Sequence, residues 1–336
     1  MLELDTGPGA DAPGLPRIDY DSHPAYGGMF PADPARGAQG VARADPVAAA
    51  SVEAQAARLR RLAQRGEPGS DLSRKMARDG VAKLEFQPTE FEAFAEACSP
   101  MVELVRGRVD AARAANQPVT REVAKLWLNR EEHASAFAAA TRLLSAAGAL
   151  DTVRRYYGAD GSKLRNLTIA VSRPGQSWST QLFKDVEVET PATTGFHIDT
   201  DPACVLKTVI YLSDVGPEQG AFGCIPTSQH WDQDSPNRAR ARACHKVRLT
   251  LMDPDSRHTF ASLPKPYQFK ASFGGDMLEG APESLALLES EQRSLGPRGL
   301  MTLFDPETIH RGGHVDTGER IAVIAGMGAI WSQPEG

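Results

Sequence analysis

The stretch TTGFHIDTDPACVLKTVIYLSDVGPEQGAFGCIP, residues 193–226, decides the fold class of this 336-residue chain. It contains three short runs of strand-forming residues, and Gly, Pro and Asp separate them. Similar runs occupy residues 164–172, 178–188, 299–305 and 320–330. Most of these runs follow one another without a helical pattern between them, which is typical of an antiparallel sandwich or jelly roll. We therefore expect an α+β protein with a jelly-roll core.

A helical part precedes these strands. Apolar residues recur at helical spacing between Ser51 and Tyr157, and Thr89 and Glu92 have the spacing of a capping box. One expected apolar face contains Val52, Ala56, Leu59 and Ala63, and another contains Phe91, Phe94, Ala95 and Cys98. Further helices are expected over residues 121–128, 131–147 and 150–157, and the last of them ends at Gly158.

These patterns predict the domain organisation. Residues 1–50 are rich in Pro, Gly, Ala and Asp without a sustained period, so we expect a flexible arm there. Residues 51–336 are expected to form one domain, with a helical part (51–160) and a jelly-roll part (161–336). Residues 231–298 interrupt the strand series and are too many for a structureless loop, so we expect an insertion that acts as a lid or binding element.

Charge and composition exclude several classes of partner. The chain has 37 Lys and Arg residues against 43 Asp and Glu residues, a net charge of -6, which disfavours binding to nucleic acid or anionic membranes. It contains no run of eighteen apolar residues and no basic, apolar leader, so we expect neither a membrane span nor a signal peptide. The four cysteines form no CxxC pair, which favours reduced thiols and a cytoplasmic location.

One histidine and one aspartate have the spacing of metal ligands. His197 and Asp199 are separated by one residue, so in an extended chain both side chains leave the same face. The later run LFDPETIHRGG supplies His310 as a third ligand, in preference to His314, which lies only six residues before Arg320. Two imidazoles and one carboxylate are the ligand set of non-haem Fe(II) oxygenases, although a His-x-Asp pair also occurs by chance.

Arg320 predicts an anion site. A guanidinium that is always charged, at the mouth of an apolar strand, requires an anion, and a dicarboxylate co-substrate would provide one. The alternative is a local ion pair with Glu319 or Asp316. Thr194 and Gln181 are candidate donors to the keto acid of such a co-substrate, although ordinary strand polarity explains them equally well.

The run FHIDTDPACVLKTVIYLSDVGPEQGAFGCIPTSQHW, with LFDPETIHRGG, Arg320 and the earlier KMARDGVAKLEF, resembles the phytanoyl-CoA dioxygenase-like family of Fe(II)/2-oxoglutarate oxygenases. The resemblance spans about residues 72–331 and implies a double-stranded β-helix core. The iron ligands that it implies are His197, Asp199 and His310, and the clamp for the C5 carboxylate of 2-oxoglutarate is Arg320. The family's Pro-Gly-Ser-His turn is altered here, with Thr227 where Gly is usual and one added residue. The related halogenases lack the carboxylate ligand, so the presence of Asp199 disfavours them.

The first part of the insertion is basic. Residues 231–270 hold eight basic and four acidic side chains, an excess that would guide an anionic substrate toward the iron. A solvated helical face is the alternative. Arg240 and Arg242 are the residues on which this hypothesis is tested.

Together these observations predict an Fe(II)/2-oxoglutarate-dependent dioxygenase that uses O2 to hydroxylate a small-molecule substrate and releases succinate. Two alternatives stay open at this point. The same oxidant can serve desaturation, cyclisation or epoxidation, and a jelly-roll protein can retain a metal without turnover. The substrate and the oligomeric state are not fixed by the sequence.

Overall fold

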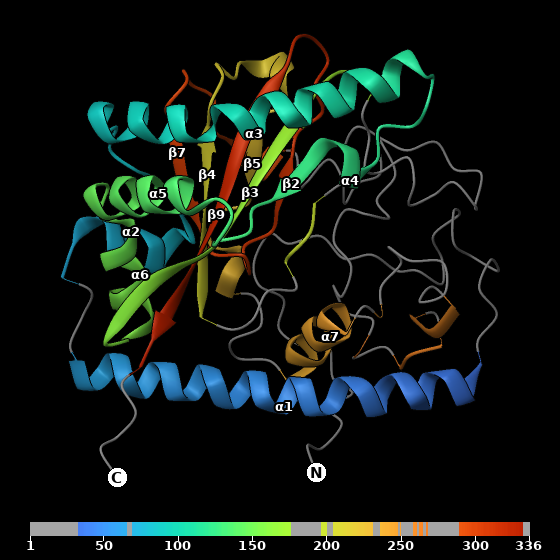
Figure 1. Ribbon diagram of the computed structural model, residues 1–336. Coiled ribbons are helices and arrows are strands. Elements are labelled where there is room, and N and C mark those ends of the chain that lie inside the picture. The colour runs from blue at the N-terminus through green and yellow to red at the C-terminus, as the bar shows by residue number, and fades with distance from the viewer. Residues whose placement is uncertain are drawn as a thin grey trace.

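The computed structural model describes residues 33–65, 69–175, 196–199, 204–230, 236–247, 249, 258–260, 262–264, 267 and 289–331. Two antiparallel sheets form its centre (Figure 1). The large sheet has the order β1-β7-β4-β9-β3-β2, and the small sheet has the order β6-β5-β8. The strands of the large sheet are β1 (Val81–Lys83), β2 (Lys125–Trp127), β3 (Gly161–Ser172), β4 (Val205–Tyr211), β7 (Met301–Phe304) and β9 (Arg320–Ile330). Those of the small sheet are β5 (Phe222–Cys224), β6 (Gln292–Arg293) and β8 (His310–Gly312).

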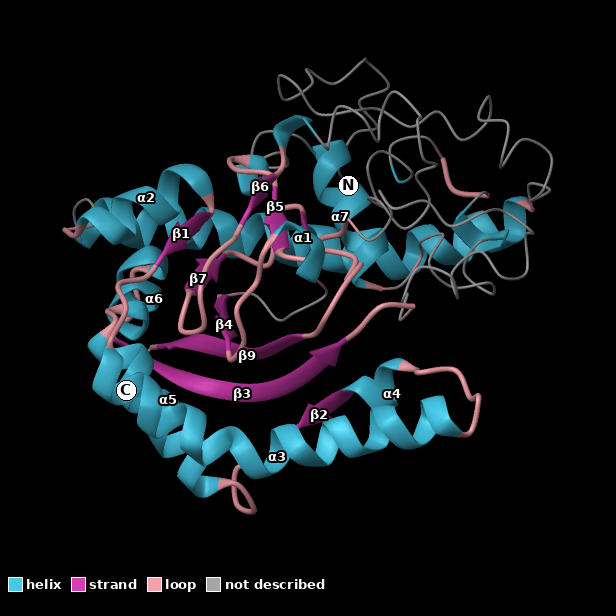
Figure 2. Ribbon diagram, turned by 90° about the horizontal axis from the view of Figure 1, so that it is seen from above, coloured by secondary structure: helices cyan, strands magenta, loops and turns pink. Residues whose placement is uncertain are grey.

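The large sheet lies between a layer of helices and the small sheet. Figure 2 shows α3 (Pro88–Ala114) and α5 (Ala134–Ala146) on one side of β3 and β9, and β5 and β6 on the other side. Side chains alternate between these layers because successive residues of a strand point to opposite faces. On β4, Leu206 and Ile210 belong to the helix-side core, whereas Val209 and Tyr211 pack with residues of the small sheet.

Helix α6 (Ala149–Tyr157) ends as its sequence predicts. Gly158 has φ 61° in the left-handed region, which residues with a side chain rarely adopt, and its N–H caps the last turn. Helix α2 (Asp71–Asp79) ends in the same way at Gly80, with φ 70°. The helix expected over residues 131–147 is present as α5, and Phe91, Phe94 and Cys98 are buried on α3 as their spacing predicts.

The prediction of a flexible arm over residues 1–50 is wrong for residues 34–50. Helix α1 (Pro34–Arg65) includes residues 34–50 and lies along α7 (Pro236–Lys246), as Figure 1 shows. Gly37 allows α1 to lie close to Ser262 as well, because a Cβ built on Gly37 would come within 2.2 Å of the carbonyl oxygen of Ser262. Contacts with distant residues therefore stabilise a helix whose Pro and Gly content argues against it. Residues 1–32 lie outside the described residues.

Two local expectations in the helical part are also wrong. The helix predicted over residues 121–128 ends at Ala124 as α4 (Arg121–Ala124), and β2 follows it and pairs with β3. Pairing at the sheet edge overrides the local helical pattern. The Thr89–Glu92 capping box does not form, because α3 begins at Pro88 and Glu92 forms an ion pair with Arg298.

Five of the seven predicted strand runs are strands or contain one. They are β3, β4, β5, β7 and β9. Within the run 193–199, residues 196–199 are described and contribute a single β-bridge between His197 and His310, and the run 178–188 lies outside the described residues. Strands β1, β2, β6 and β8 are two or three residues long, too short for an alternating pattern.

The sequence predicted that no segment spans a membrane and that the cysteines are free thiols. Across the described part of the chain, no helix combines the length and the apolar character that crossing a bilayer requires. The four cysteines are free, as predicted. Burial raises the pKa of Cys98, Cys224 and Cys244 to about 12, so these thiols are protonated and unreactive near neutral pH.

Candidate metal centre

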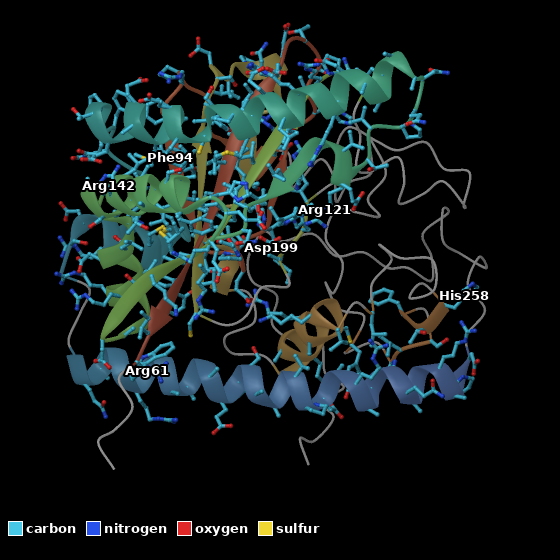
Figure 3. All side chains as sticks on the ribbon, in the orientation of Figure 1. Arg61, Phe94, Arg121, Arg142, Asp199 and His258 are labelled. Carbon is cyan, nitrogen blue, oxygen red and sulfur yellow. The ribbon has the colours of Figure 1, made fainter. Side chains whose placement is uncertain are left out.

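His197, Asp199 and His310 come together in the structure. Each offers one ligand atom, and these three atoms lie within 4.8 Å of one another. His197 and His310 form an antiparallel β-bridge, in which each backbone N–H donates to the other's carbonyl oxygen at 2.9 Å. Asp199 lies near the middle of the molecule in Figure 3. The bridge explains how residues more than 100 positions apart in the sequence share one site.

The turn between β7 and β8, residues 305–309, holds the backbone of Asp199 and the side chain of His310. The carbonyl oxygen of Pro306 accepts a hydrogen bond from the backbone N–H of Asp199 at 2.9 Å. The carbonyl oxygen of Thr308 lies 2.7 Å from Nδ1 of His310. A carbonyl oxygen only accepts hydrogen bonds, so Nδ1 carries the proton and Nε2 keeps a free lone pair. That Nε2 lies 3.3 Å from Oδ2 of Asp199, and Nε2 of His197 lies 3.4 Å from Oδ1.

The protonation states match those of metal ligands. Burial lowers the pKa of His310, against the opposing effect of Asp199, so its imidazole is neutral near pH 7. Burial alone would raise the pKa of Asp199, but the adjacent imidazoles of His310 and His197 and the charge of Lys207 hold that pKa well below its ordinary value. The centre therefore offers a neutral imidazole and an ionised carboxylate.

Three cations of the large sheet face the small sheet near this centre. Side-chain alternation places Lys207 on the same face of β4 as Val209 and Tyr211, and Arg320 on the same face of β9 as Ala322. On β2, Leu126 packs against the helix-side core, so Lys125 points the opposite way, toward the centre. Nζ of Lys207 donates a hydrogen bond to Oδ2 of Asp199 at 2.7 Å.

Lys125 is a functional candidate that the sequence did not suggest. Burial, with repulsion from Arg121, Arg320 and Lys207, lowers its pKa to about 8, while attraction to Asp199 opposes this shift. Its place in a segment that we expected to be helical concealed it. Had the segment 125–127 been recognised as a strand, the alternation Lys-Leu-Trp would have placed Lys125 opposite the apolar Leu126.

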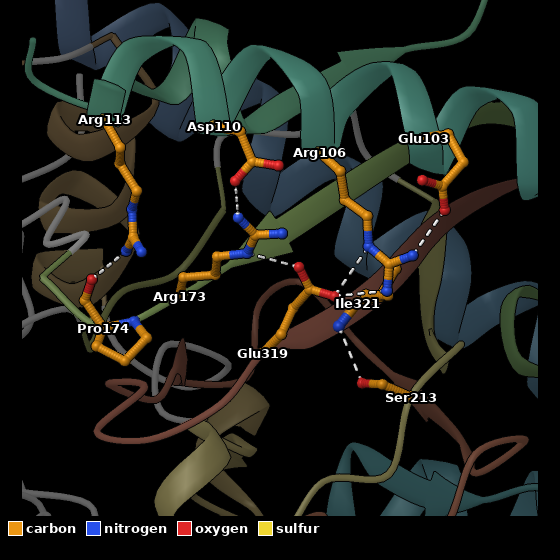
Figure 4. Close-up of polar contacts among 9 residues, drawn as sticks. All are labelled: Glu103, Arg106, Asp110, Arg113, Arg173, Pro174, Ser213, Glu319 and Ile321. Atoms are coloured by element: carbon orange, nitrogen blue, oxygen red, sulfur yellow. Dashed lines mark hydrogen bonds and ion pairs between the residues drawn. The ribbon is translucent and has the colours of Figure 1, made fainter. Parts of the chain in front are cut away.

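Arg320 does not form the local ion pair that was its alternative explanation. Glu319 instead accepts hydrogen bonds from Arg106 and Arg173, each at 2.6 Å, in the network that joins α3 to the start of β9 (Figure 4). Nη2 of Arg320 donates to Oγ of Ser172 at 3.1 Å, and Nη1 donates to the carbonyl oxygen of Gly313 at 3.3 Å. Among the described residues, no carboxylate forms an ion pair with Arg320.

Gly312 places Arg320 close to His310. A Cβ built on Gly312 would lie 3.2 Å from Nη2 of Arg320, and Gly312 follows His310 by two residues on β8. Two residues of strand span roughly 6.6 Å. The guanidinium therefore lies against β8, two residues along the strand from His310.

The other predicted site residues have different outcomes. Thr194 and Gln181 lie outside the described residues. His314 is exposed and does not belong to the triad, whereas His310 is buried. Thr227, the departure from the family's turn, has φ 68°, the left-handed conformation that glycine favours.

The hypothesis that Arg240 and Arg242 guide an anionic substrate is wrong. Both side chains are buried on α7, with 3% and 5% of their surfaces exposed. Arg240 lies 3.9 Å from a carboxylate oxygen of Asp45, and Arg242 forms an ion pair with Glu307. Both guanidinium groups face acidic side chains inside the protein, so they do not form a surface that attracts anions.

Comparison with known proteins gives structural matches alone. No family model and no curated protein matches the chain. It is similar to EctD from S. alaskensis, solved with 2-oxoglutarate and 5-hydroxyectoine, at 17% identity and a TM-score of 0.46, over 78% of this chain and 77% of that one. It is also similar to two alpha-ketoglutarate-dependent non-haem enzymes of nogalamycin biosynthesis. The epimerase SnoN matches at 15% identity and a TM-score of 0.40, over 77% of this chain and 79% of that one. The carbocyclase SnoK matches at 14% identity and a TM-score of 0.41, over 77% of this chain and 84% of that one.

Of these three neighbours, one was solved with 2-oxoglutarate and two are described as alpha-ketoglutarate-dependent. At these identities and TM-scores the likeness does not decide what this chain does. The geometry of its own residues has to do so.

Proposed function

We propose that this chain is an Fe(II)/2-oxoglutarate-dependent dioxygenase of the phytanoyl-CoA dioxygenase-like type, with a double-stranded β-helix core, that hydroxylates a small molecule. The observation that carries this proposal is the convergence of His197, Asp199 and His310 within 4.8 Å. Their roles would be those of the three protein ligands of the iron.

The donor set and its spacing fit a divalent metal ion. Ligand atoms about 2.1 Å from an ion and at right angles to one another lie about 3 Å apart. The separations of 3.3 and 3.4 Å between the carboxylate oxygens of Asp199 and the two Nε2 atoms are close to this value. Two imidazole nitrogens and one carboxylate leave further positions open for a chelating co-substrate, as in non-haem Fe(II) oxygenases.

A cationic inner face fits 2-oxoglutarate, a dianion. Arg320 lies near His310, is half-buried and has no described carboxylate partner, so its guanidinium would bind the C5 carboxylate. Lys125 adds a second half-buried cation to the same face. A site with these fixed charges attracts a diacid and orients it without large rearrangement.

When bound, iron with 2-oxoglutarate and O2 supplies the oxidising chemistry, which yields succinate, CO2 and a hydroxylated substrate. The protein itself orients the reactants and keeps the centre dry. Phe304 and Phe222 pack against the ring of His310, with ring centroids 4.8 and 5.8 Å apart, and cover one side of the centre with apolar surface. This shielding limits side reactions with water.

The proposal is tested by adding 2-oxoglutarate to the Fe(II)-loaded protein without oxygen and recording the visible spectrum. A charge-transfer band is expected, followed by succinate formation when air and a suitable metabolite are supplied. A protein that binds Fe(II) but shows neither band nor succinate would instead be a metal-retaining binding protein. Product analysis then distinguishes hydroxylation from desaturation, cyclisation or epoxidation.

A further inference from the structure

The β7–β8 turn carries the two carbonyl groups that orient Asp199 and His310, and Glu307 lies between them in the chain. The carbonyl oxygens of Pro306 and Thr308 make these two contacts. Contacts that hold Glu307 therefore restrain the backbone between these two carbonyl groups.

Two different layers of the protein hold this turn. On one side Tyr156 of α6 donates a hydrogen bond from its hydroxyl to Oδ2 of Asp305 at 2.6 Å, and Oδ1 of Asp305 accepts from the backbone N–H of Glu307 at 2.9 Å. On the other side α7 binds the Glu307 side chain. Nζ of Lys246 lies 2.8 Å from Oε1, and the guanidinium of Arg242 pairs with Oε2.

Arg242 also binds the backbone of the turn. Its Nη2 donates to the carbonyl oxygen of Glu307 at 3.2 Å, so one guanidinium contacts both the side chain and the main chain of the same residue. Its side chain is 5% exposed, and that of Lys246 is 17% exposed. Hydrogen bonds and charge pairs in such a protected place are stronger than on the surface and fix one geometry.

We propose that Arg242 and Lys246 are positioning residues for the metal centre, and that they act through Glu307 to hold the carbonyl groups that orient Asp199 and His310. Helix α7 thus stabilises the metal centre without contacting the metal ion. Partners that orient metal ligands commonly change metal affinity by about 10- to 100-fold when they are lost. The inference rests on the proposed function, because it assumes that the triad binds a metal ion.

The test measures the dissociation constant of Mn(II), with the electron paramagnetic resonance signal of the free ion as the readout. Arg242→Gln and Glu307→Gln are each expected to weaken Mn(II) binding about tenfold. The double variant should be no weaker than either single variant, because the two residues act through one contact. Arg242→Lys keeps a cation near Glu307 and is expected to recover most of the affinity, which also provides a measurement if Arg242→Gln fails to fold.

Arg240→Gln is the matched control. Arg240 is an equally buried arginine on the same helix, but it pairs with Asp45 of α1 and not with the turn. Its replacement should leave the Mn(II) constant within twofold of the unmodified protein. An unchanged constant in Arg242→Gln, or an equal loss in Arg240→Gln, would overturn the positioning role.

His310→Ala separates this inference from the proposed function. If the unmodified protein binds Mn(II) and His310→Ala does not, the metal centre is confirmed. The α7 variants then test only the positioning role of Arg242 and Lys246. If His310→Ala binds Mn(II) as well as the unmodified protein does, the metal centre itself is wrong, and the role of α7 is wrong with it.

Discussion

Lys207, on β4 of the large sheet, donates a hydrogen bond to the carboxylate of Asp199 at 2.7 Å. Both side chains are largely buried, so each charge depends on the other. The same carboxylate is the only acid of the triad. Lys207 and a bound metal ion therefore compete for one negative charge.

This competition predicts opposite effects of Lys207→Met on the two states of the protein. The melting temperature without metal should fall, because Asp199 loses its cation. The increase in melting temperature that saturating Mn(II) causes should become larger than in the unmodified protein. Differential scanning fluorimetry with and without Mn(II) measures both quantities, and a smaller increase would show that Lys207 supports metal binding.

The third ligand is tested by paired histidine substitutions. His310→Ala should abolish metal-dependent succinate formation, because a neutral nitrogen donor is lost from the triad. His314→Ala should retain it, since His314 is exposed and lies outside the triad. Full activity of His310→Ala, or its loss in His314→Ala, would reverse the assignment.

Arg320→Ala should raise the KM for 2-oxoglutarate by about 10- to 100-fold, the range expected when a charge-assisted contact is lost. The kcat at saturating co-substrate should change much less. 2-Oxopentanoate, which lacks the terminal carboxylate, is the probe of mechanism. The unmodified protein should prefer 2-oxoglutarate strongly, and Arg320→Ala should lose that preference. A preserved preference would place the carboxylate elsewhere.

Thr227→Gly should stabilise the protein. A β-branched residue at φ 68° is strained by roughly 1–2 kcal/mol, and glycine removes this strain at the cost of some chain entropy. We expect a net gain of about 0.5–1 kcal/mol in the free energy of unfolding, measured by urea denaturation. Asn116→Gly is the control, because Asn116 has φ 53° but asparagine tolerates that region, so its gain should be smaller.

Asp79 contributes stability that depends on pH. Its hydrogen bond with Arg78, and further attraction to Lys75, lower its pKa to about 2, although burial acts in the opposite direction. Because the pKa in the folded state lies below that of the unfolded state, the contribution is complete above about pH 4 and disappears as the pH falls toward 2. Asp79→Asn should therefore cost about 1–2 kcal/mol at pH 7 and almost nothing near pH 2. Equal costs at both pH values would show that this ion pair does not matter.

The sequence predicted the features that depend on local spacing. The His197-x-Asp199 pair is local, and the later His310 was found because few histidines compete for the third position. The terminating role of Gly158 is local as well, since it depends on one backbone conformation.

Features that depend on distant partners escaped prediction. Lys125 lies in a three-residue strand whose conformation is set by pairing with β3. Arg242 was taken as a surface charge because its acidic partner, Glu307, lies 65 residues away in the sequence. Long-range pairing and burial of charge are properties of the assembled fold, and they leave no periodic pattern in the segment itself.

The pairing of α1 with α7 has a consequence for how the chain is made. Ala44 and Ala48 of α1 are buried, yet the helix that covers this segment begins about 170 residues after α1 ends. At ordinary rates of synthesis, roughly ten to thirty seconds pass before α7 is available. During that interval the apolar side of α1 is exposed on the nascent polypeptide, so cotranslational chaperones have a defined segment to protect.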